Sequence, residues 1–121
     1  MYKVLICGSR FYTDYERVLH YIRRLKATSV HGDIVIIAGG ARGADTLAVK
    51  AAIACGLPFR EYPAQWEKYG KKAGPIRNQI MLDMEKPGLV VAFHENIDGS
   101  KGTKDMVSRA KRNHVPVVIF K

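Results

Sequence analysis

Short apolar runs alternate with segments of helical periodicity along the chain. Each run is bounded by glycine, proline or charged residues, a pattern typical of buried strands. Four such runs lie at residues 3–7, 34–38, 89–93 and 116–120, and a further short strand is expected near residues 59–62. Strands that alternate with helices form parallel sheets covered by helices on both faces. We therefore predict an α/β, three-layer fold with a five-stranded, mainly parallel sheet, built by residues 1–121 as a single domain.

Helical segments are expected between the strands. A capping box of the form Ser/Thr-x-x-Glu at residues 13–16 predicts the start of the first helix. The other helices are expected at 44–54, 75–85 and 103–113. In the helix expected at 75–85, the apolar spacing puts Ile76, Ile80 and Met84 on one face, which we expect to be buried.

The connection at residues 63–74 is longer than most loops of α/β proteins. Long ordered loops in compact domains are often functional. Its aromatic residues, Trp66 and Tyr69, have two open interpretations: stacking on a nucleobase, or pinning the loop to the edge of the sheet.

A glycine-rich turn, Gly39-Gly40-Ala41-Arg42-Gly43-Ala44-Asp45, joins the second strand to the next helix. Its glycines allow close approach of the backbone to a ligand, and the helix start supplies free N–H groups. The spacing is neither G-x-G-x-x-G nor that of a P-loop. The turn is therefore predicted to hold an anion in another way, with a purely structural strand-to-helix turn as the alternative.

Three polar turns are expected to meet at one edge of the sheet. They comprise residues 8–10, residues 39–45 and residues 99–103, and Arg77 at a helix start can join them. In parallel sheets, ligands bind at the carboxyl ends of the strands, beside the point where the strand order reverses. Backbone N–H groups and arginine side chains are what a phosphate group needs. The sequence therefore predicts a site for a phosphorylated ligand at this edge.

Composition limits the partners. The net charge of +9 fits either weak, non-specific attraction to nucleic acid and phosphorylated molecules, or a solvated basic surface. No apolar run approaches the roughly 18 residues of a membrane helix, and no signal-peptide pattern is present, so we expect a cytoplasmic protein without a membrane partner. Cys7 and Cys55 are predicted to be buried free thiols. The histidines show no metal-ligand spacing, so neither a metal nor another cofactor is expected.

Several short motifs occur in a fixed order along the chain. They are Gly8-Ser9-Arg10, Gly39-Gly40-Ala41-Arg42-Gly43-Ala44-Asp45, Pro63-Ala64-x-Trp66, Arg77-Asn78-x-x-Met81 and Gly102-Thr103-x-x-Met106. In this order they resemble the cpYpsA-related branch of the SLOG superfamily, which also holds the LOG phosphoribohydrolases and DprA. The resemblance implies a Rossmann-like fold that binds a nucleotide or nucleotide-derived ligand at the C-terminal edge of the sheet, for sensing, sequestration or processing.

The resemblance also implies the residues that contact the ligand. They are Gly8, Ser9, Arg10, Gly39, Gly40, Arg42, Gly43, Asp45, Arg77, Asn78, Gly99, Gly102 and Thr103. Asp45 would either accept a ribose hydroxyl or stabilise the start of its helix, and both interpretations stay open. A homo-oligomer is expected as well.

One position departs from the enzymes of this superfamily. In the LOG motif PGGxGTxxE a glutamate serves hydrolysis, and Met106 stands in its place here. Whether the protein is an enzyme is therefore left open, and its catalytic residues are unknown. One alternative function is a LOG-like phosphoribohydrolase of nucleoside 5′-monophosphates, which would need Glu95, Asp98 or Asp105 to point inward. A second alternative is DprA-like binding of nucleic acid by the basic helix faces.

Overall fold

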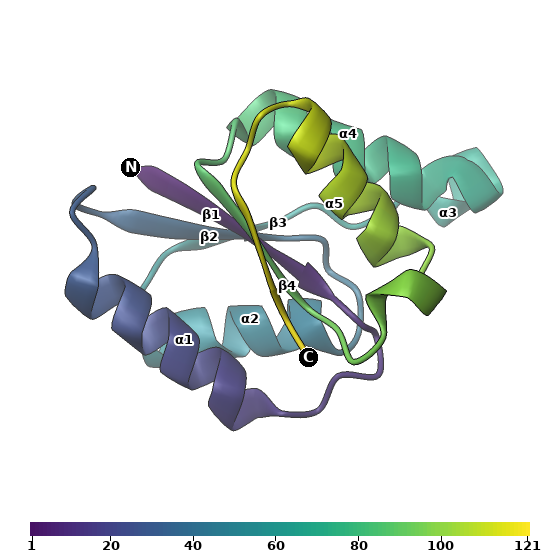
Figure 1. Cartoon of the computed structure of the whole chain (residues 1–121). Helices are drawn as coiled ribbons and strands as arrows, with labels where there is room; N and C mark the ends of the chain where they lie inside the picture. The colour runs from purple at the N-terminus through teal and green to yellow at the C-terminus, as the bar shows by residue number, and fades with distance from the viewer.

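Five strands pair into one sheet in the computed structural model, which describes residues 1–121 (Figure 1). They are β1 (Tyr2–Gly8), β2 (Ile34–Ala38), β3 (Phe59–Glu61), β4 (Leu89–Phe93) and β5 (Val117–Phe120). Their order in the sheet is β3-β2-β1-β4-β5, and every neighbouring pair is parallel. The predicted α/β fold is confirmed, with a sheet that is parallel throughout rather than mainly so.

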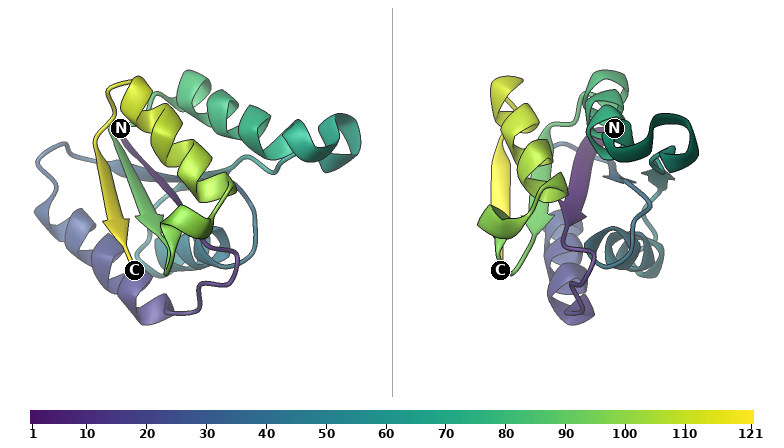
Figure 2. Two further views of the ribbon diagram at one scale, coloured as in Figure 1. Left: turned by 45° about the vertical axis from the view of Figure 1, so that its right-hand side comes forward. Right: turned by 90° about the vertical axis from the view of Figure 1, so that its right-hand side faces the viewer.

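Helices cover both faces of the sheet (Figures 1 and 2). They are α1 (Tyr15–Thr28), α2 (Ala44–Ala54), α3 (Trp66–Tyr69), α4 (Ala73–Glu85) and α5 (Gly102–Arg112), with 3-10 turns at η1 (Gly70–Lys72) and η2 (Ile97–Gly99). Side chains alternate between the faces of a strand. Ile6 and Ile36 therefore pack under α1 and α2, whereas Leu5 and Ile37 pack under α4 and α5.

The face that α4 buries differs from the predicted one. Met81 and Leu82 are buried, whereas Ile80 and Met84 are 41% and 70% exposed. The buried side of the helix also carries the polar residues Asn78 and Glu85, so its apolar periodicity is interrupted. The prediction was wrong because buried polar side chains with hydrogen-bond partners occupy positions that a hydrophobic pattern assigns to solvent.

Glu85 holds two strands and a helix together. Its side chain is 3% exposed, and it accepts hydrogen bonds from the Tyr62 hydroxyl and from Arg60 at 2.6 Å. Lys3 Nζ on β1 lies 3.4 Å from the same carboxylate. Burial opposes ionisation of Glu85, but these hydrogen bonds outweigh it and lower its pKa. The carboxylate therefore joins α4 to β1 and to the chain at β3.

Helix starts also differ in detail from the prediction. Asp14, and not Thr13, caps α1, because its Oδ1 accepts the Arg17 N–H at 3.1 Å. The stretch at residues 63–74 is not one irregular loop, since it contains α3 and η1 and α4 begins at Ala73.

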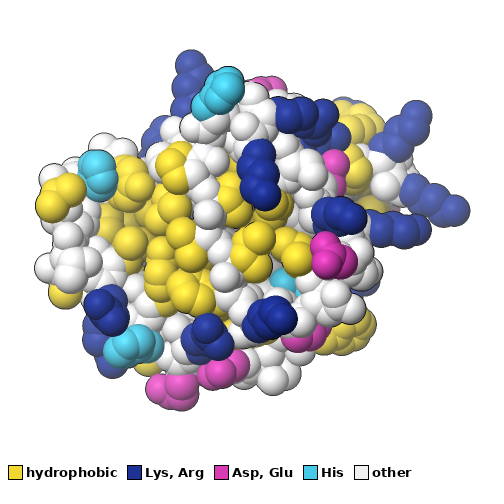
Figure 3. Space-filling view, viewed as in Figure 1, with side chains coloured by type: hydrophobic (Ala, Val, Ile, Leu, Met, Phe, Trp, Pro, Cys, Tyr) yellow, Lys and Arg dark blue, Asp and Glu magenta, His cyan; other side chains and the backbone are white.

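Both edges of the sheet are partly exposed. The three residues of β3 are all exposed, and the short strand expected near residues 59–62 is an edge strand. β5 forms the other edge, where Ile119 is 43% exposed. On that side of the molecule, hydrophobic side chains lie across the middle of the surface and Lys and Arg side chains surround them (Figure 3). None of the helices is long and apolar enough to cross a membrane.

Candidate functional site

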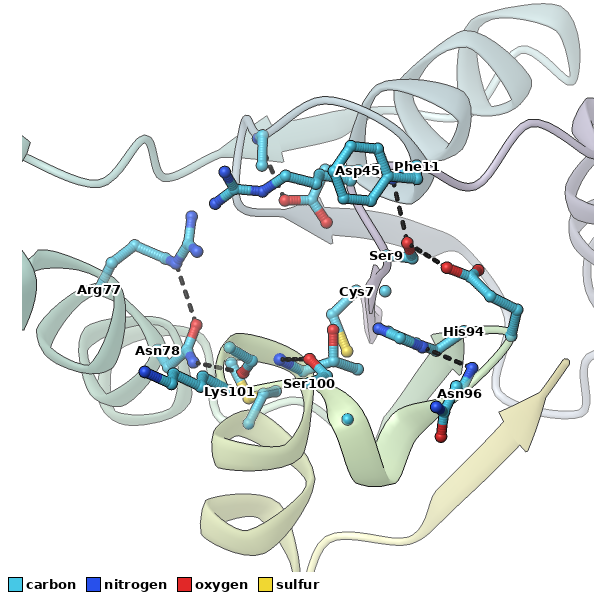
Figure 4. Close-up of a pocket in the computed structure, with 18 residues that line it drawn as sticks. Cys7, Ser9, Phe11, Asp45, Arg77, Asn78, His94, Asn96, Ser100 and Lys101 are labelled. Carbon is cyan, nitrogen blue, oxygen red and sulfur yellow. Dashed lines mark hydrogen bonds between the residues drawn. The ribbon is translucent and has the colours of Figure 1, made fainter.

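A pocket of about 510 Å³ opens at the carboxyl edge of the sheet, where the β1 and β4 strands end (Figure 4). The chain runs outward from β1 to β2 and β3 and later returns to β4, so the strand order reverses here. This is where open α/β sheets bind their ligands. The turns after β1 and β4, the start of α2 and the first turns of α4 and α5 all contribute lining residues.

Ser9 fixes the turn after β1. Its Oγ donates to Glu95 Oε1 at 2.8 Å and accepts the Phe11 N–H at 3.0 Å. Its carbonyl accepts the N–H groups of Tyr12 and Ala44. Ser9 is 4% exposed and its polar groups are engaged within the protein. It therefore positions the wall of the pocket and ties it to β4 and α2.

Asp45 and Arg77 bring opposite charges to the inner part of the pocket (Figure 4). Asp45 is 6% exposed, and burial raises its pKa to about 6, although the Ala41 N–H and the Arg77 charge favour its ionised form. Arg77 Nη1 donates to the carbonyls of Gly39 and Tyr62. The start of α4 is thereby held against the turn after β2.

Asn78 connects the two helix starts that line the pocket. Its Oδ1 accepts from Arg77 Nε at 3.0 Å, and its Nδ2 donates to Asp105 Oδ2 at 3.0 Å and to the Gly102 carbonyl at 3.3 Å. Arg109 Nε donates to the same Asp105 oxygen at 2.8 Å. This network fixes the beginning of α5 relative to α4.

The start of α5 presents hydrogen-bond donors to the pocket. The N-cap residue, Lys101, makes no side-chain cap, and the Thr103 N–H is bound by Ser100 Oγ at 3.1 Å. The Thr103 hydroxyl makes no hydrogen bond within the chain. Every side-chain polar atom that is buried has a hydrogen-bond partner, so the Thr103 hydroxyl, which has none, is not buried. It is therefore accessible from the pocket that Thr103 lines. A helix start with a free hydroxyl and a lysine favours an anion.

The turn after β4 forms the opposite wall. The hydrogen bond from Ser9 lowers the pKa of Glu95, so this carboxylate is ionised at neutral pH. His94 Nδ1 accepts the Asn96 N–H at 2.9 Å, which gives the neutral ring its proton on the other nitrogen.

Most of the site residues expected from sequence meet at this pocket. Those that line it are Gly8, Ser9, Arg10, Asp45, Arg77, Asn78, Gly99, Gly102 and Thr103. Those that do not are Gly39, Gly40, Arg42 and Gly43.

The glycines outside the pocket have contacts within the protein. A Cβ on Gly43, where φ is +72°, would collide with the backbone of Ser9 and Arg10. A Cβ on Gly39 would collide with the Arg77 guanidinium, and one on Gly40 would lie 3.3 Å from Pro63. The glycine-rich turn therefore packs against other segments of the chain, and it contributes Ala41 and Asp45 to the pocket.

Sequence reasoning missed the lining residues Phe11, His94 and Asn96, and it placed Ala41, Ser100 and Lys101 at this edge only as members of the predicted turns. Their position after a buried strand or before the last helix was the one available signal. Met106 lines the pocket and is 1% exposed, and Asp98 does not line it.

Other candidates take simple roles. Both cysteines are free, and they are half-buried rather than fully buried as predicted. Burial, and then the Asp45 charge, raise the pKa of the Cys7 thiol, which therefore stays protonated. Trp66 and Tyr69 lie outside the pocket, at 54% and 37% exposure. No cluster of three potential metal ligands occurs in the chain.

Comparison with known proteins relates the chain to one family. The model of the YspA, cpYpsA-related SLOG family matches residues 2–69. Gene 61 protein of Mycobacterium phage D29 is 34% identical over 125 residues, which cover 99% of this chain and 97% of the phage protein.

A solved structure shares the fold. DNA processing protein A (DprA) from Streptococcus pneumoniae matches 98% of this chain with a TM-score of 0.74 and 21% sequence identity. The chain spans 50% of the DprA chain. At this identity the likeness shows the Rossmann-like fold.

Proposed function

Because the chain belongs to the YspA, cpYpsA-related SLOG family, we propose that it binds a nucleotide or nucleotide-derived small molecule in the pocket between β1 and β4. The observation that carries this proposal is the start of α5, where an unbound hydroxyl and a helix end without a cap from the Lys101 side chain line a pocket at the strand-order reversal. A volume of about 510 Å³ is in the range of small-ligand pockets.

The ligand's phosphate is assigned to the start of α5. The Thr103 hydroxyl and those N–H groups of the first turn that Ser100 does not bind donate hydrogen bonds to it, and Lys101 adds a positive charge. Gly102 leaves room for close approach, because nothing lies within 4 Å of the position of a Cβ there. Arg10 and Arg77 line the same pocket and complement the remaining negative charge.

The ligand's sugar is assigned to Asp45. A carboxylate at the inner wall of the pocket is a hydrogen-bond acceptor for ribose hydroxyls. Its Oδ2 accepts the Ala41 N–H at 3.1 Å, which leaves Oδ1 for the ligand. The Asp45 carboxylate also repels the negative phosphate, so the sugar and the phosphate of the ligand lie on opposite sides of the pocket.

Binding of long nucleic acid has little support from the face of the molecule in Figure 3. Lys and Arg side chains are spread around the face in Figure 3 and do not form one stripe. Such a surface gives weak, salt-dependent binding without sequence preference. Homo-oligomerisation and a cytoplasmic location stay predictions.

The test is calorimetric titration of the protein with AMP, GMP, CMP and UMP. Thr103→Val keeps the shape of the side chain and removes only the hydroxyl, so it should weaken binding about tenfold or more while the protein stays folded. Thr28→Val, on α1 and far from the pocket lining, is the matched control. If T103V and the unmodified protein bind with equal affinity, the assignment of the phosphate to the start of α5 is wrong.

A further inference from the structure

A second, shallow groove of about 550 Å³ adjoins the main pocket. Arg10 and Phe11 line both, so the two spaces are continuous around the turn after β1. Phe11 is 78% exposed, and both its side chain and that of Asp45 line the main pocket (Figure 4). The ring is not on a loose loop, because the Phe11 N–H is bound to Ser9 Oγ at 3.0 Å.

The groove is positively charged. Arg10 and Arg42 line it, and neither pairs with a carboxylate, since the ion pairs of the chain are Lys3–Glu85, Arg60–Glu85 and Arg109–Asp105. Its remaining lining includes Gly43, Leu47 and two threonines. An exposed aromatic ring and two arginines without ion-pair partners in one groove have the chemistry of a site for a base and a phosphate.

We propose that this groove binds the second nucleoside of a dinucleotide whose first phosphate lies at the start of α5. This inference rests on the proposed function. The second base stacks on Phe11, and Arg10 and Arg42 hold the phosphate that joins the two nucleosides. Charge complementarity and continuity with the main pocket support this path of the ligand: the first phosphate at α5, the first sugar at Asp45, the linking phosphate at Arg10 and Arg42, and the second base on Phe11.

The geometry gives the two regions separate residues. Thr103 and Lys101 line only the main pocket, and Arg42 lines only the groove. A mononucleotide therefore uses the first set, and a dinucleotide uses both.

The experiment titrates AMP, the 5′-phosphorylated dinucleotide pApA and a ten-residue deoxyadenosine strand. We expect pApA to bind about tenfold or more tightly than AMP. Phe11→Ala should weaken pApA binding about 5- to 150-fold, the usual effect of one lost stacking contact, and should weaken AMP binding less. Phe59→Ala, which removes an exposed phenylalanine on β3 outside both spaces, is the matched control. Arg42→Ala, at a residue that lines only the groove, should weaken pApA binding and leave AMP binding within about twofold.

The outcomes separate this inference from the proposed function. If AMP binds and pApA gains nothing, the groove has no ligand and only this inference fails. If F11A weakens AMP as much as pApA, the first base lies on Phe11 and the inference is overturned. If the deoxyadenosine strand binds more than about tenfold more tightly than pApA, the ligand of the groove is single-stranded nucleic acid and the dinucleotide proposal is overturned. If no nucleotide binds, both proposals fail.

Discussion

Replacing Asp45 by asparagine should stabilise the protein at neutral pH and weaken its ligand binding. Burial raises the pKa of Asp45 from 3.8 to about 6, so the carboxylate that is ionised at pH 7.5 lies in surroundings that oppose its charge. Asparagine has nearly the same shape. Its side-chain oxygen can accept the Ala41 N–H that Asp45 Oδ2 accepts at 3.1 Å. The substitution therefore removes the charge and keeps the contact.

The pKa of Asp45 in the folded and unfolded states sets the size of this effect. One pKa unit corresponds to about 1.36 kcal/mol, so a rise from 3.8 to about 6 lowers the free energy of unfolding by about 3 kcal/mol once both states are ionised. Between these pH values the folded protein keeps a proton that the unfolded chain has released. Stability from this group is therefore full below pH 3.8 and falls as the pH rises to about 6.

Urea unfolding of both proteins across this pH range is the assay. D45N should be about 3 kcal/mol more stable at about pH 7.5, with a difference near zero at about pH 3.5. Asp98→Asn, an exposed carboxylate outside the pocket, should change stability by less than about 0.5 kcal/mol. D45N should also bind AMP about tenfold or more weakly, since the ribose loses a charged acceptor. A gain in stability that is absent at pH 7.5, or equal at both pH values, would refute the argument from buried charge.

Further predictions concern packing. Glu85→Ala should lower the free energy of unfolding by about 3 kcal/mol at pH 7 in denaturant titrations, because it leaves a tyrosine hydroxyl and an arginine without their acceptor. Its contribution should be lost as the pH falls below 4.5, because the pKa of Glu85 is lowered in the folded state. Gly43→Ala should reduce Tm more than Gly32→Ala: both glycines have positive φ, but only at Gly43 would the Cβ meet backbone. Met81→Ala should cost about 2–5 kcal/mol in the same titrations, whereas Met84→Ala should cost less than about 0.5 kcal/mol, which checks the buried face of α4.

The central strands were predictable because they are buried on both faces. A strand covered by helices on either side is a continuous apolar run, as β2 and β4 are, and such runs have few alternative interpretations. β3 was not predictable in this way, since an edge strand need not be apolar. The face of α4 was mispredicted because Glu85 is buried together with its hydrogen-bond partners, which only the tertiary structure supplies.

The position of the site followed from topology, and its lining did not. Parallel strands place the turns after them on one edge, which brings Ser9 and Asp45 to one pocket. Glycine-rich sequence, however, does not distinguish close approach of a ligand from close approach of the protein's own backbone. Gly43 belongs to the second kind, because it packs on the turn that contains Ser9. Phe11 joined the site through a hydrogen bond to Ser9, which no spacing in the sequence reveals.

The carboxylates around the pocket bear on whether the ligand is turned over. Cleavage of a glycosidic bond needs a positioned proton donor or acceptor. Met106 supplies neither, and Asp105 is engaged by Asn78 and Arg109.

Two other carboxylates, Glu95 and Asp45, line the pocket and have pKa values shifted in opposite directions. The pKa of Glu95 is lowered by Ser9, and that of Asp45 is raised by burial to about 6. An ionised and a protonatable carboxylate are the pair that acid and base roles require. Asp45 is also the predicted sugar contact, so a turnover reaction would depend on the same residue that weakens binding when replaced. If the protein only binds its ligand, D45N keeps some affinity, and neither D45N nor the unmodified protein releases a free nucleobase. If the protein is an enzyme, it releases the nucleobase only while Asp45 is present. Because Asp45 protonates at about pH 6, such release would also depend on pH in that range.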